Sequence, residues 1–281
     1  MLNNKTILIT GATGSFGQKF VSKIINKYKS IKKIIVFSRD EYKQLLMKEK
    51  FEKKNFKNLR FFLGDIRDVD RLKQAFEGVD VIVHAAALKQ VPAAEYNPIE
   101  FIKTNIIGAQ NIIEAAIEKN VSKVLSLSTD KAVAPINLYG ATKLCSDKLF
   151  LAANNIKGNK KITFSILRYG NVMMSRGSVI PVFLNIKDNK FPVTDKKMTR
   201  FSITLDESVE MAIKSLKYAS GGEIFIPKFK SYKIIDLVKA ISGNGKIKNI
   251  GIRPGEKIHE ELISKGETAD IFSYKDFYII S

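Results

Sequence analysis

A tyrosine and a lysine four positions apart are the first chemically informative pair in this sequence. Tyr139 and Lys143 fall on one face of a predicted helix, because residues i and i+4 are neighbours on a helical surface. A tyrosine phenol has an ordinary pKa of about 10 and is a poor base at neutral pH. An ammonium group one turn away favours the phenolate, so the pair suits removal of a proton from a substrate hydroxyl.

A second reactive group closes the strand predicted just before that helix. Thr129 and Asp130 end the strand and Lys131 follows directly. Open α/β sheets bind ligands beyond the carboxyl ends of their strands. An adjacent carboxylate and amine can run acid and base steps in one site, because each changes the protonation cost of the other. The alternative interpretation is that Asp130 only caps a turn and that Lys131 points to water.

A glycine-rich loop follows the first predicted strand and opens the first helix. Its GxxGxxG spacing permits a tight turn, close approach of a pyrophosphate, and close packing of helix on strand. Free backbone N–H groups at the helix N-terminus then face the phosphates. The sequence therefore predicts a dinucleotide-binding loop made by Gly11, Thr13, Gly14, Ser15, Phe16 and Gly17.

The end of the second strand bears on the choice of dinucleotide. Ser38 and Arg39 come before the acidic Asp40, and Lys43 follows. A hydroxyl and a guanidinium suit a ribose 2′-phosphate, whereas an acidic residue at the strand end would suit free ribose hydroxyls. NADP is therefore predicted over NAD. Asp40 keeps NAD open, and a plain surface role for Arg39 is the alternative.

Further cofactor contacts are predicted at the ends of the next two strands. Asp65 and Ile66 follow the third strand, where Asp65 would lie beside the adenine. Ala86 belongs to a run of small residues after the fourth strand, where a cofactor must approach the backbone, and Lys89 comes next in reach of cofactor or sugar. His84 is interpreted as a packed histidine at a strand end.

The elements that must position these residues alternate between strand and helix patterns. Apolar runs predict strands at 6–10, 33–38, 59–64, 79–85, 123–129 and 161–167, and amphipathic patterns predict helices at 18–29, 69–76, 104–119 and 139–154. This alternation indicates a Rossmann-type, doubly wound parallel sheet. Residues 1–170 are predicted to form this NADP-binding domain, and residues 171–281 a smaller, interleaved α/β substrate-binding lobe. For the lobe, helices are predicted at 206–218, 234–241 and 255–264, with a strand at 223–227.

Composition excludes several classes of protein. The 281 residues carry a net charge of +19, but the lysines are spread along the chain, so a polyanionic small molecule is favoured over nucleic acid. No apolar run approaches the ~20 residues of a membrane span, and no signal peptide is apparent. The single Cys145 fits a reducing compartment, so a cytoplasmic location without membrane partners is expected. No metal site is predicted.

Longer motifs give a resemblance that covers essentially the whole chain. They are Thr-Asp-Lys at 129–131, Pro-Ile-Asn-Leu-Tyr-Gly-Ala-Thr-Lys at 135–143, Arg-Tyr-Gly-Asn-Val at 168–172, Ser-Arg-Gly-Ser-Val-Ile-Pro at 175–181, Met-Thr-Arg-Phe at 198–201 and Ile-Arg-Pro-Gly-Glu-Lys at 252–257. The sequence resembles the extended short-chain dehydrogenase/reductases, and within them the inverting UDP-N-acetylglucosamine 4,6-dehydratases that start pseudaminic acid pathways. Members of that family are expected to continue beyond residue 281, so a C-terminal segment is expected to be missing.

The resemblance implies oxidation at C4, elimination of water across C5 and C6, and return of hydride to C6. The product would be UDP-2-acetamido-2,6-dideoxy-β-L-arabino-hex-4-ulose. Lys131 would remove the C5 proton and Asp130 would help protonate the leaving oxygen, with Thr129, Tyr139 and Lys143 completing the catalytic set. A homo-oligomer is implied. The residues implied around a UDP-sugar are Lys89, Asn171, Thr194, Arg253 and Glu256.

Two other functions stay open from the sequence. Retaining dehydratases resemble Thr-Asp-Glu where this chain has Lys131, and sugar 4-epimerases carry small or hydroxyl residues there. A UDP-sugar 4-epimerase or another nucleotide-sugar dehydratase is therefore the second enzyme hypothesis. A catalytically silent NADP-binding protein is the hypothesis from a different class.

Overall fold

The computed structural model describes residues 1–52, 56–175, 178–267 and 270–281. Arg176 and Gly177, inside the motif at 175–181, lie outside the described residues. No helix in the described part of the chain combines the length and the apolar character that a membrane crossing requires.

The described strands build one large sheet in the order β13-β14-β10-β6-β5-β4-β1-β2-β3. All neighbours from β3 to β10 are parallel, and β14 and β13 add an antiparallel edge. The bounds are β1 Thr6–Thr10, β2 Lys33–Ser38, β3 Leu59–Leu63, β4 Val81–His84, β5 Lys123–Thr129, β6 Thr163–Tyr169, β10 Ile224–Pro227, β13 Ile271–Ser273 and β14 Phe277–Ile280. The predicted doubly wound fold is confirmed, and its strand order reverses between β1 and β4.

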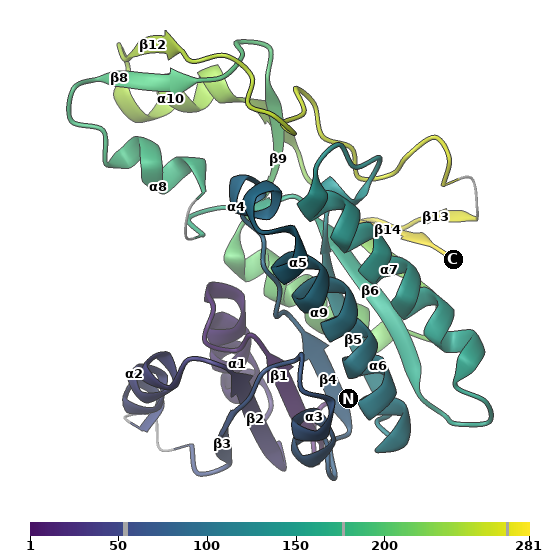
Figure 1. Cartoon of the computed structure of the whole chain (residues 1–281). Helices are drawn as coiled ribbons and strands as arrows, with labels where there is room; N and C mark the ends of the chain where they lie inside the picture. Colours follow the sequence, from purple (N-terminus) through teal and green to yellow (C-terminus); the bar gives the residue numbers. More distant parts are fainter. Residues whose placement is uncertain (53–55, 176–177, 268–269) are drawn as a thin grey trace.

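Helices cover both faces of this sheet, which is why its central strands are apolar on both sides. One face packs against α1, α2 and α9, and the other against α3, α6 and α7. Figure 1 shows α6 and α7 side by side over the sheet. The bounds are α1 Ser15–Lys27, α2 Glu41–Glu52, α3 Val69–Ala75, α6 Gly108–Glu118, α7 Leu138–Ile156 and α9 Leu205–Tyr218.

Short helical segments connect the sheet to the loops at its carboxyl edge. They are α4 Val91–Tyr96, α5 Pro98–Phe101, the π-helix η1 Ile102–Ile107 and the 3-10 helix η2 Asp130–Ala132. Together η1 and α6 fill the region predicted as one helix, and the change to π geometry shifts which side chains face the sheet. Single π turns of this kind often occur at functional sites.

A smaller lobe stands beyond the carboxyl edge of the sheet, at the top of Figure 1. Its apolar core includes Phe183, Phe191, Met198 and Val238. Its elements form a three-stranded sheet, β11-β9-β7, and a two-stranded sheet, β12-β8. The bounds are β7 Asn171–Val172, α8 Val179–Leu184, β8 Lys190–Val193, β9 Thr199–Ile203, β11 Ser231–Lys233, α10 Ile234–Ser242 and β12 Lys246–Asn249.

The chain passes between the two parts more than once. After the excursion from β7 to β9, α9 and β10 return to the large sheet, and β13 and β14 return to it again at the end. The division into a domain of residues 1–170 and an interleaved lobe of residues 171–281 stays a prediction. The helix predicted at 255–264 is wrong: these residues form turns and bends, and Gly255 has φ +73°.

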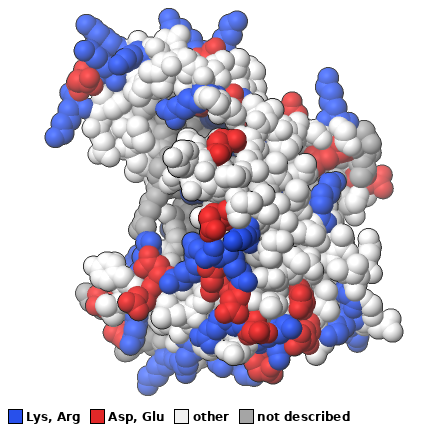
Figure 2. Space-filling model, in the orientation of Figure 1, with Lys and Arg blue, Asp and Glu red and all other residues white. Residues whose placement is uncertain are grey.

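Charged side chains are distributed differently over the two parts. Figure 2 shows Lys and Arg around the outer end of the smaller lobe, and mixed acidic and basic side chains over the lower part of the same face. Ion pairs join many of the latter, for example Arg67 with Glu100 at 2.7 Å and Lys73 with Glu118 at 2.8 Å. The large positive charge is thus partly neutralised locally around the sheet.

Candidate active site

A cleft of about 1000 Å³ runs along the carboxyl edge of the large sheet and beneath the smaller lobe. One end lies at the switch point between β1 and β4, where open α/β sheets bind ligands. The other end is walled by residues of the smaller lobe, including Thr194, Arg200 and Arg253. One continuous cleft therefore joins the predicted cofactor residues to the predicted substrate residues.

The glycine loop fits a dinucleotide because its backbone leaves no room for side chains. Gly11 has φ +64°, and a Cβ added there would lie 2.9 Å from the backbone of Ala85. At Gly17 an added Cβ would lie 2.4 Å from the Cα of Ala12, so α1 packs directly on the loop. Gly14 is the N-cap of α1, which presents the helix N-terminus to the cleft. The residues present fit a pyrophosphate at this position.

The loop after β2 presents more positive than negative charge to the cleft. Both carboxylate oxygens of Asp40 are engaged by Lys43, one by its backbone N–H at 2.9 Å and one by its ammonium group. Those contacts lower the pKa of Asp40, the hydrogen bond from the Lys43 side chain first. Arg39 is half exposed and lies 3.4 Å from Asp65. Ser38 accepts a hydrogen bond from Gln44 at 3.0 Å, which fixes the strand end.

A buried hydroxyl ties β1 to β4 beside the glycine loop. Thr10 Oγ1 accepts from the N–H groups of Ala85 and Ala86 at 3.2 and 3.3 Å. With its lone pairs used, the hydroxyl donates to His84 Nδ1, 2.8 Å away. Burial first, and then the charge of Lys143, lower the pKa of His84 to about 3. The histidine is thus a neutral packed residue, as the sequence predicted.

The tyrosine–lysine pair is buried at the centre of the cleft. Lys143 donates to the Leu127 carbonyl at 2.9 Å, and its pKa is lowered by burial against the opposing effect of Asp147. Burial raises the pKa of Tyr139 to about 12, although the charge of Lys131 and a hydrogen bond with Thr129 act in the opposite direction. The phenol of Tyr139 is therefore neutral at neutral pH, and additional positive charge near it would favour the phenolate.

Lys131 is the second residue after β5, and its amine faces three oxygen atoms. Its Nζ lies 3.0 Å from Asp130 Oδ1, 3.3 Å from Asn171 Oδ1 and 3.4 Å from Glu260 Oε1. Burial alone lowers the pKa of Lys131, but the carboxylates of Asp130 and Glu260 outweigh it and raise the pKa above its ordinary value. A lysine held between two carboxylates is an ammonium group at neutral pH.

The wall of the cleft that carries Lys89 is held by a residue of the π-helix. The amide of Asn105 donates to the Leu88 carbonyl at 2.9 Å and accepts from the Leu88 N–H at 2.9 Å. It also donates to Thr142 on α7 at 3.0 Å. The neighbouring Lys89 is largely exposed, yet burial of its amine against the cleft and the charge of Lys131 lower its pKa.

The substrate end of the cleft is joined to α7 through a cap. Asn137 caps α7 by accepting from the Gly140 N–H at 2.7 Å, and its amide donates to the Gly255 carbonyl at 2.7 Å. Glu256 is held by Arg200 at 3.5 Å and by the backbone N–H of Arg253 at 3.4 Å. A displacement of the smaller lobe would therefore also displace the first turn of α7, the helix that carries Tyr139.

The cleft brings together nearly all of the residues predicted from the sequence. Asp130 is the exception, since its side chain is fully buried behind the wall and meets the cleft through Lys131. The cleft is lined by Gly11, Thr13, Gly14, Ser15, Phe16, Gly17, Ser38, Arg39, Lys43, Asp65, Ile66, Ala86, Lys89, Thr129, Lys131, Tyr139, Lys143, Asn171, Thr194, Arg253 and Glu256. Proximity does not test their roles, which stay predictions.

Sequence reasoning missed several polar residues that support the site. Arg168 is fully buried and pairs with Glu267 at 2.7 Å and with Asp147 at 3.6 Å, beneath Lys143. Asp147 also accepts from Ser128 at 2.6 Å. Only the position of Asp147 one turn after Lys143 could have suggested this from sequence. Glu260 had no such signal, because its partner Lys131 is far away in the chain.

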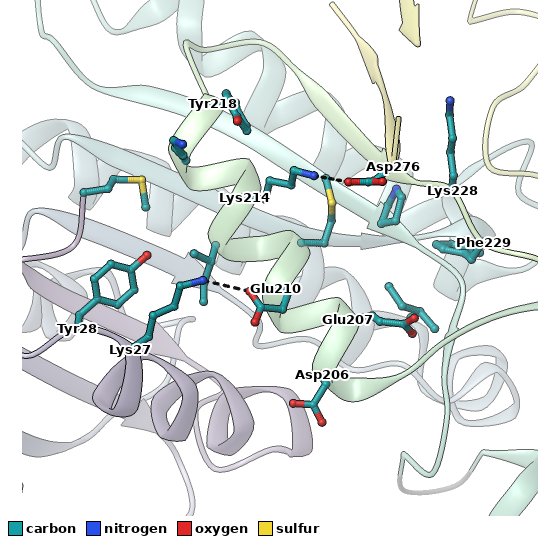
Figure 3. A pocket seen from close by; sticks show the side chains of 16 residues that line it. Lys27, Tyr28, Asp206, Glu207, Glu210, Lys214, Tyr218, Lys228, Phe229 and Asp276 are labelled. Carbon is teal, nitrogen blue, oxygen red and sulfur yellow. Dashed lines mark hydrogen bonds and ion pairs between the residues drawn. The ribbon is translucent and has the colours of Figure 1, made fainter. Parts of the chain in front are cut away.

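A second cavity, of about 830 Å³, lies along α9 and is drawn in Figure 3. Two of its lysines pair with carboxylates in its wall: Lys27 lies 3.3 Å from Glu210, and Lys214 lies 2.7 Å from Asp276. Figure 3 draws both contacts as dashed lines between the labelled side chains. Neither the glycine loop nor the tyrosine–lysine pair reaches it, so the chemistry belongs to the larger cleft.

Comparison with known sequences identifies relatives over the full chain. A family model described as "Polysaccharide biosynthesis protein" matches residues 7–281. The inverting UDP-N-acetylglucosamine 4,6-dehydratase of Campylobacter jejuni (strain 81-176) is 51% identical over 100% of this chain and 84% of its own length. The UDP-glucose 4-epimerase of Rickettsia bellii (strain RML369-C) is 44% identical over 100% of this chain and 84% of its own.

Solved structures agree on the fold. Pen from Bacillus thuringiensis is 42% identical, with a TM-score of 0.93 over 99% of this chain and 90% of its own. DesIV from Streptomyces venezuelae, a dTDP-glucose 4,6-dehydratase with NAD and TYD bound, has a TM-score of 0.80 at 23% identity, over 93% of this chain and 89% of its own. The second likeness is one of fold alone.

Proposed function

Because the chain belongs to the polysaccharide biosynthesis protein family, we propose that it is a UDP-N-acetylglucosamine 4,6-dehydratase that inverts C5. The observation that carries the proposal is Lys131, which lies beside Asp130 in the cleft that also holds Tyr139 and Lys143. A 4,6-dehydratase needs a base for the C4 hydroxyl and a second base for C5, and these side chains supply both in one cavity. The name of the Campylobacter relative, at 51% identity, agrees with this chemistry.

Tyr139 is assigned the first proton. The positive charge of Lys131 lowers the pKa of its buried phenol, and Lys143 lies on the same face of α7. When bound, a nicotinamide dinucleotide supplies the hydride acceptor for C4 and the hydride donor for C6. The charge of Lys131 lowers the pKa of Tyr139 against burial, and a bound nicotinamide ring would lower it further from about 12, so that the Tyr139 phenolate would accept the C4 hydroxyl proton.

Lys131 is assigned the C5 proton, which the new C4 ketone makes acidic. The amine stands at the carboxyl end of β5, in reach of a sugar held under the smaller lobe. Loss of the C6 hydroxyl requires a proton donor, and Asp130 is assigned to it. Because the side chain of Asp130 is buried behind the wall, its proton reaches the leaving oxygen through the Lys131 amine, 3.0 Å away. A glutamate in place of Lys131 would leave the site with no cationic donor beside Asp130.

The uridine diphosphate is assigned to the opposite end of the cleft. Arg253 supplies a cation for a phosphate, and Glu256, fixed by Arg200, supplies an acceptor for ribose hydroxyls. Asn171, Thr194 and Lys89 line the space between this end and Tyr139. A sugar nucleotide bound this way has its hexose at the junction of the two lobes.

NADP is proposed as the dinucleotide. Asp40, the acidic residue that would favour NAD, is engaged by Lys43, so Ser38, Arg39 and the remaining N–H groups of Lys43 are the groups in this part of the cleft that we assign to a ribose 2′-phosphate. Titration with NADP⁺ and NAD⁺ tests this, and tighter binding of NAD⁺ would refute it.

A UDP-glucose 4-epimerase is the second candidate, because several Rickettsia relatives with that name are 42–44% identical over the full chain. Both reactions begin with oxidation at C4 and share Tyr139 and Lys143. They differ in the need for a base at C5. An epimerase returns the hydride to C4 and gives no 6-deoxy sugar, so product analysis separates the two.

The experiment is incubation with UDP-N-acetylglucosamine in deuterated water, followed by proton NMR. A 4-keto-6-deoxy product with deuterium at C5 and the L-arabino configuration is expected, with no reductant consumed. Lys131→Ala should lower the rate by at least about 10²-fold, since a positioned acid–base group contributes about 10² to 10⁴. Lys148→Ala, at an exposed lysine on α7, is the matched control and should be unaffected. A C4 epimer as the product would favour the second candidate.

A further inference from the structure

Lys131 is held by carboxylates from two separate parts of the chain. Asp130 precedes it at the end of β5, whereas Glu260 belongs to the irregular segment after β12 that walls the substrate end. The Nζ–oxygen distances are 3.0 Å to Asp130 and 3.4 Å to Glu260. The two carboxylates therefore contact the same ammonium group, one from below the cleft and one from its wall.

The carboxylate of Glu260 is buried and only partly hydrogen-bonded. Its side chain is 3% exposed, and its Oε2 has no hydrogen-bond partner among the described residues. Lys257 is the next cation; its Nζ donates to the Val133 carbonyl and lies 3.8 Å from Glu260 Oε2, beyond hydrogen-bond distance. A buried carboxylate oxygen without a hydrogen-bond partner is unfavourable, so such a group calls for an explanation.

A role for Lys131 as the base at C5 explains why a carboxylate is kept at position 260. A base must be the neutral amine, and an ammonium group between two carboxylates resists losing its proton. The position of Glu260 then decides both where the amine points and how readily it gives up a proton. The charged and titratable groups that face Lys131 are Asp130, Glu260, Tyr139, Lys89 and Tyr232.

We propose that Glu260 is a positioning residue for the reaction: it holds the Lys131 amine toward the sugar and governs when that amine loses its proton. This inference rests on the proposed function, because it assigns Lys131 the C5 proton. Asp130 is sealed behind the wall, so it anchors the amine from one side in every state. Glu260 lines the cleft, so its contact with Lys131 responds to a bound sugar nucleotide.

The test is Glu260→Gln, which keeps the shape and one hydrogen-bonding oxygen but removes the charge. The pH at which kcat/KM reaches half its plateau should move to lower pH by about 1–3 units, the range expected for loss of a neighbouring opposite charge. Glu260→Asp keeps the charge and should restore most of the wild-type midpoint. Glu261→Gln, at the exposed neighbouring glutamate, is the control and should leave the profile unchanged. An unshifted midpoint in the Glu260→Gln variant, with activity intact, would overturn the inference and leave the dehydratase proposal standing.

A second measurement does not depend on turnover. Lysines are reductively methylated with ¹³C-formaldehyde, and the Lys131 signal, identified by its loss in Lys131→Arg, is titrated by NMR. The midpoint should lie above that of the exposed lysines in wild type and should fall by about 1–3 units in Glu260→Gln. Equal midpoints in the two proteins refute the inference even if the wild type dehydrates no sugar. A shifted midpoint without dehydration refutes the proposed function alone.

Discussion

The protonation state of Tyr139 depends on burial and on the charges around its phenol. Burial dominates its environment and raises its pKa to about 12, two units above the ordinary value. Below that pKa the phenolate fraction of Tyr139 grows tenfold with each pH unit, so at neutral pH the side chain is almost entirely a neutral phenol. Positive charge brought in by a ligand would raise that fraction.

Tyr139→Phe is expected to lower kcat by about 10²- to 10⁴-fold, because it removes the group assigned to the C4 hydroxyl proton. The glycine loop and Lys143 remain, so the dissociation constant of the dinucleotide should change by no more than a few fold. Steady-state kinetics and fluorescence titration measure the two quantities. Tyr169→Phe is the control, since Tyr169 is equally buried in the same cleft but has no lysine one turn away. Equal losses in both variants would contradict a special role for Tyr139.

At the scale of elements, the first turn of α7 and the short helix η2 must fit closely to place Lys131. A Cβ added to Gly140 would lie 2.2 Å from the carbonyl oxygen of Lys131. Gly140→Ala should therefore destabilise the protein by about 1–3 kcal/mol despite the better helix propensity of alanine. Chemical denaturation and kcat measure the effect. Gly108→Ala is the matched control, because its new methyl meets only the flexible end of Ile66, at 2.8 Å. The prediction fails if Gly140→Ala is no less stable than that control.

Elements with strong local patterns were predictable from the sequence, and those fixed by distant partners were not. β1 and β6 are buried along almost their whole length, so their apolar runs identified them. Residues 255–264 have the composition of a helix, but the turn at Gly255 and the contacts of Lys257 and Glu260 with the region around Lys131 hold them in an irregular path. The same reason explains the candidate site: the loop and Tyr139 were readable as motifs, whereas Glu260 depends on a contact across the fold.

The whole molecule should become less stable in mild acid because of one neutral histidine. The pKa of His84 is about 3 in the folded protein, below its ordinary value of 6.5, so the unfolded chain binds more protons between these values. The stability contributed by neutral His84 is complete above about pH 6.5 and is lost as the pH falls toward 3. Between pH 7 and 4.5 the loss should be about 2–3 kcal/mol.

Urea denaturation of wild type and His84→Asn at the two pH values measures this contribution. Asparagine can place an oxygen near Nδ1 to accept from Thr10 but does not titrate, so the variant should lose about 2 kcal/mol less on acidification. Other groups titrate equally in both proteins and cancel in the comparison. Identical pH dependence would show that His84 is not responsible. The homo-oligomer implied by the resemblance stays a prediction at this scale.

The segment between β10 and β14 can change in length and sequence during evolution without disturbing the large sheet. These strands are adjacent and antiparallel, and where they part the Lys228 N–H donates to the Asp276 carbonyl at 2.9 Å. The chain between β10 and β13, which carries Arg253, Glu256 and Glu260, thus leaves the sheet at this edge, and β13 and β14 rejoin it along the same edge. Insertions or deletions between β10 and β13 need not change the register of any strand in the sheet. Substrate choice can therefore evolve in that segment while the dinucleotide-binding half is inherited intact.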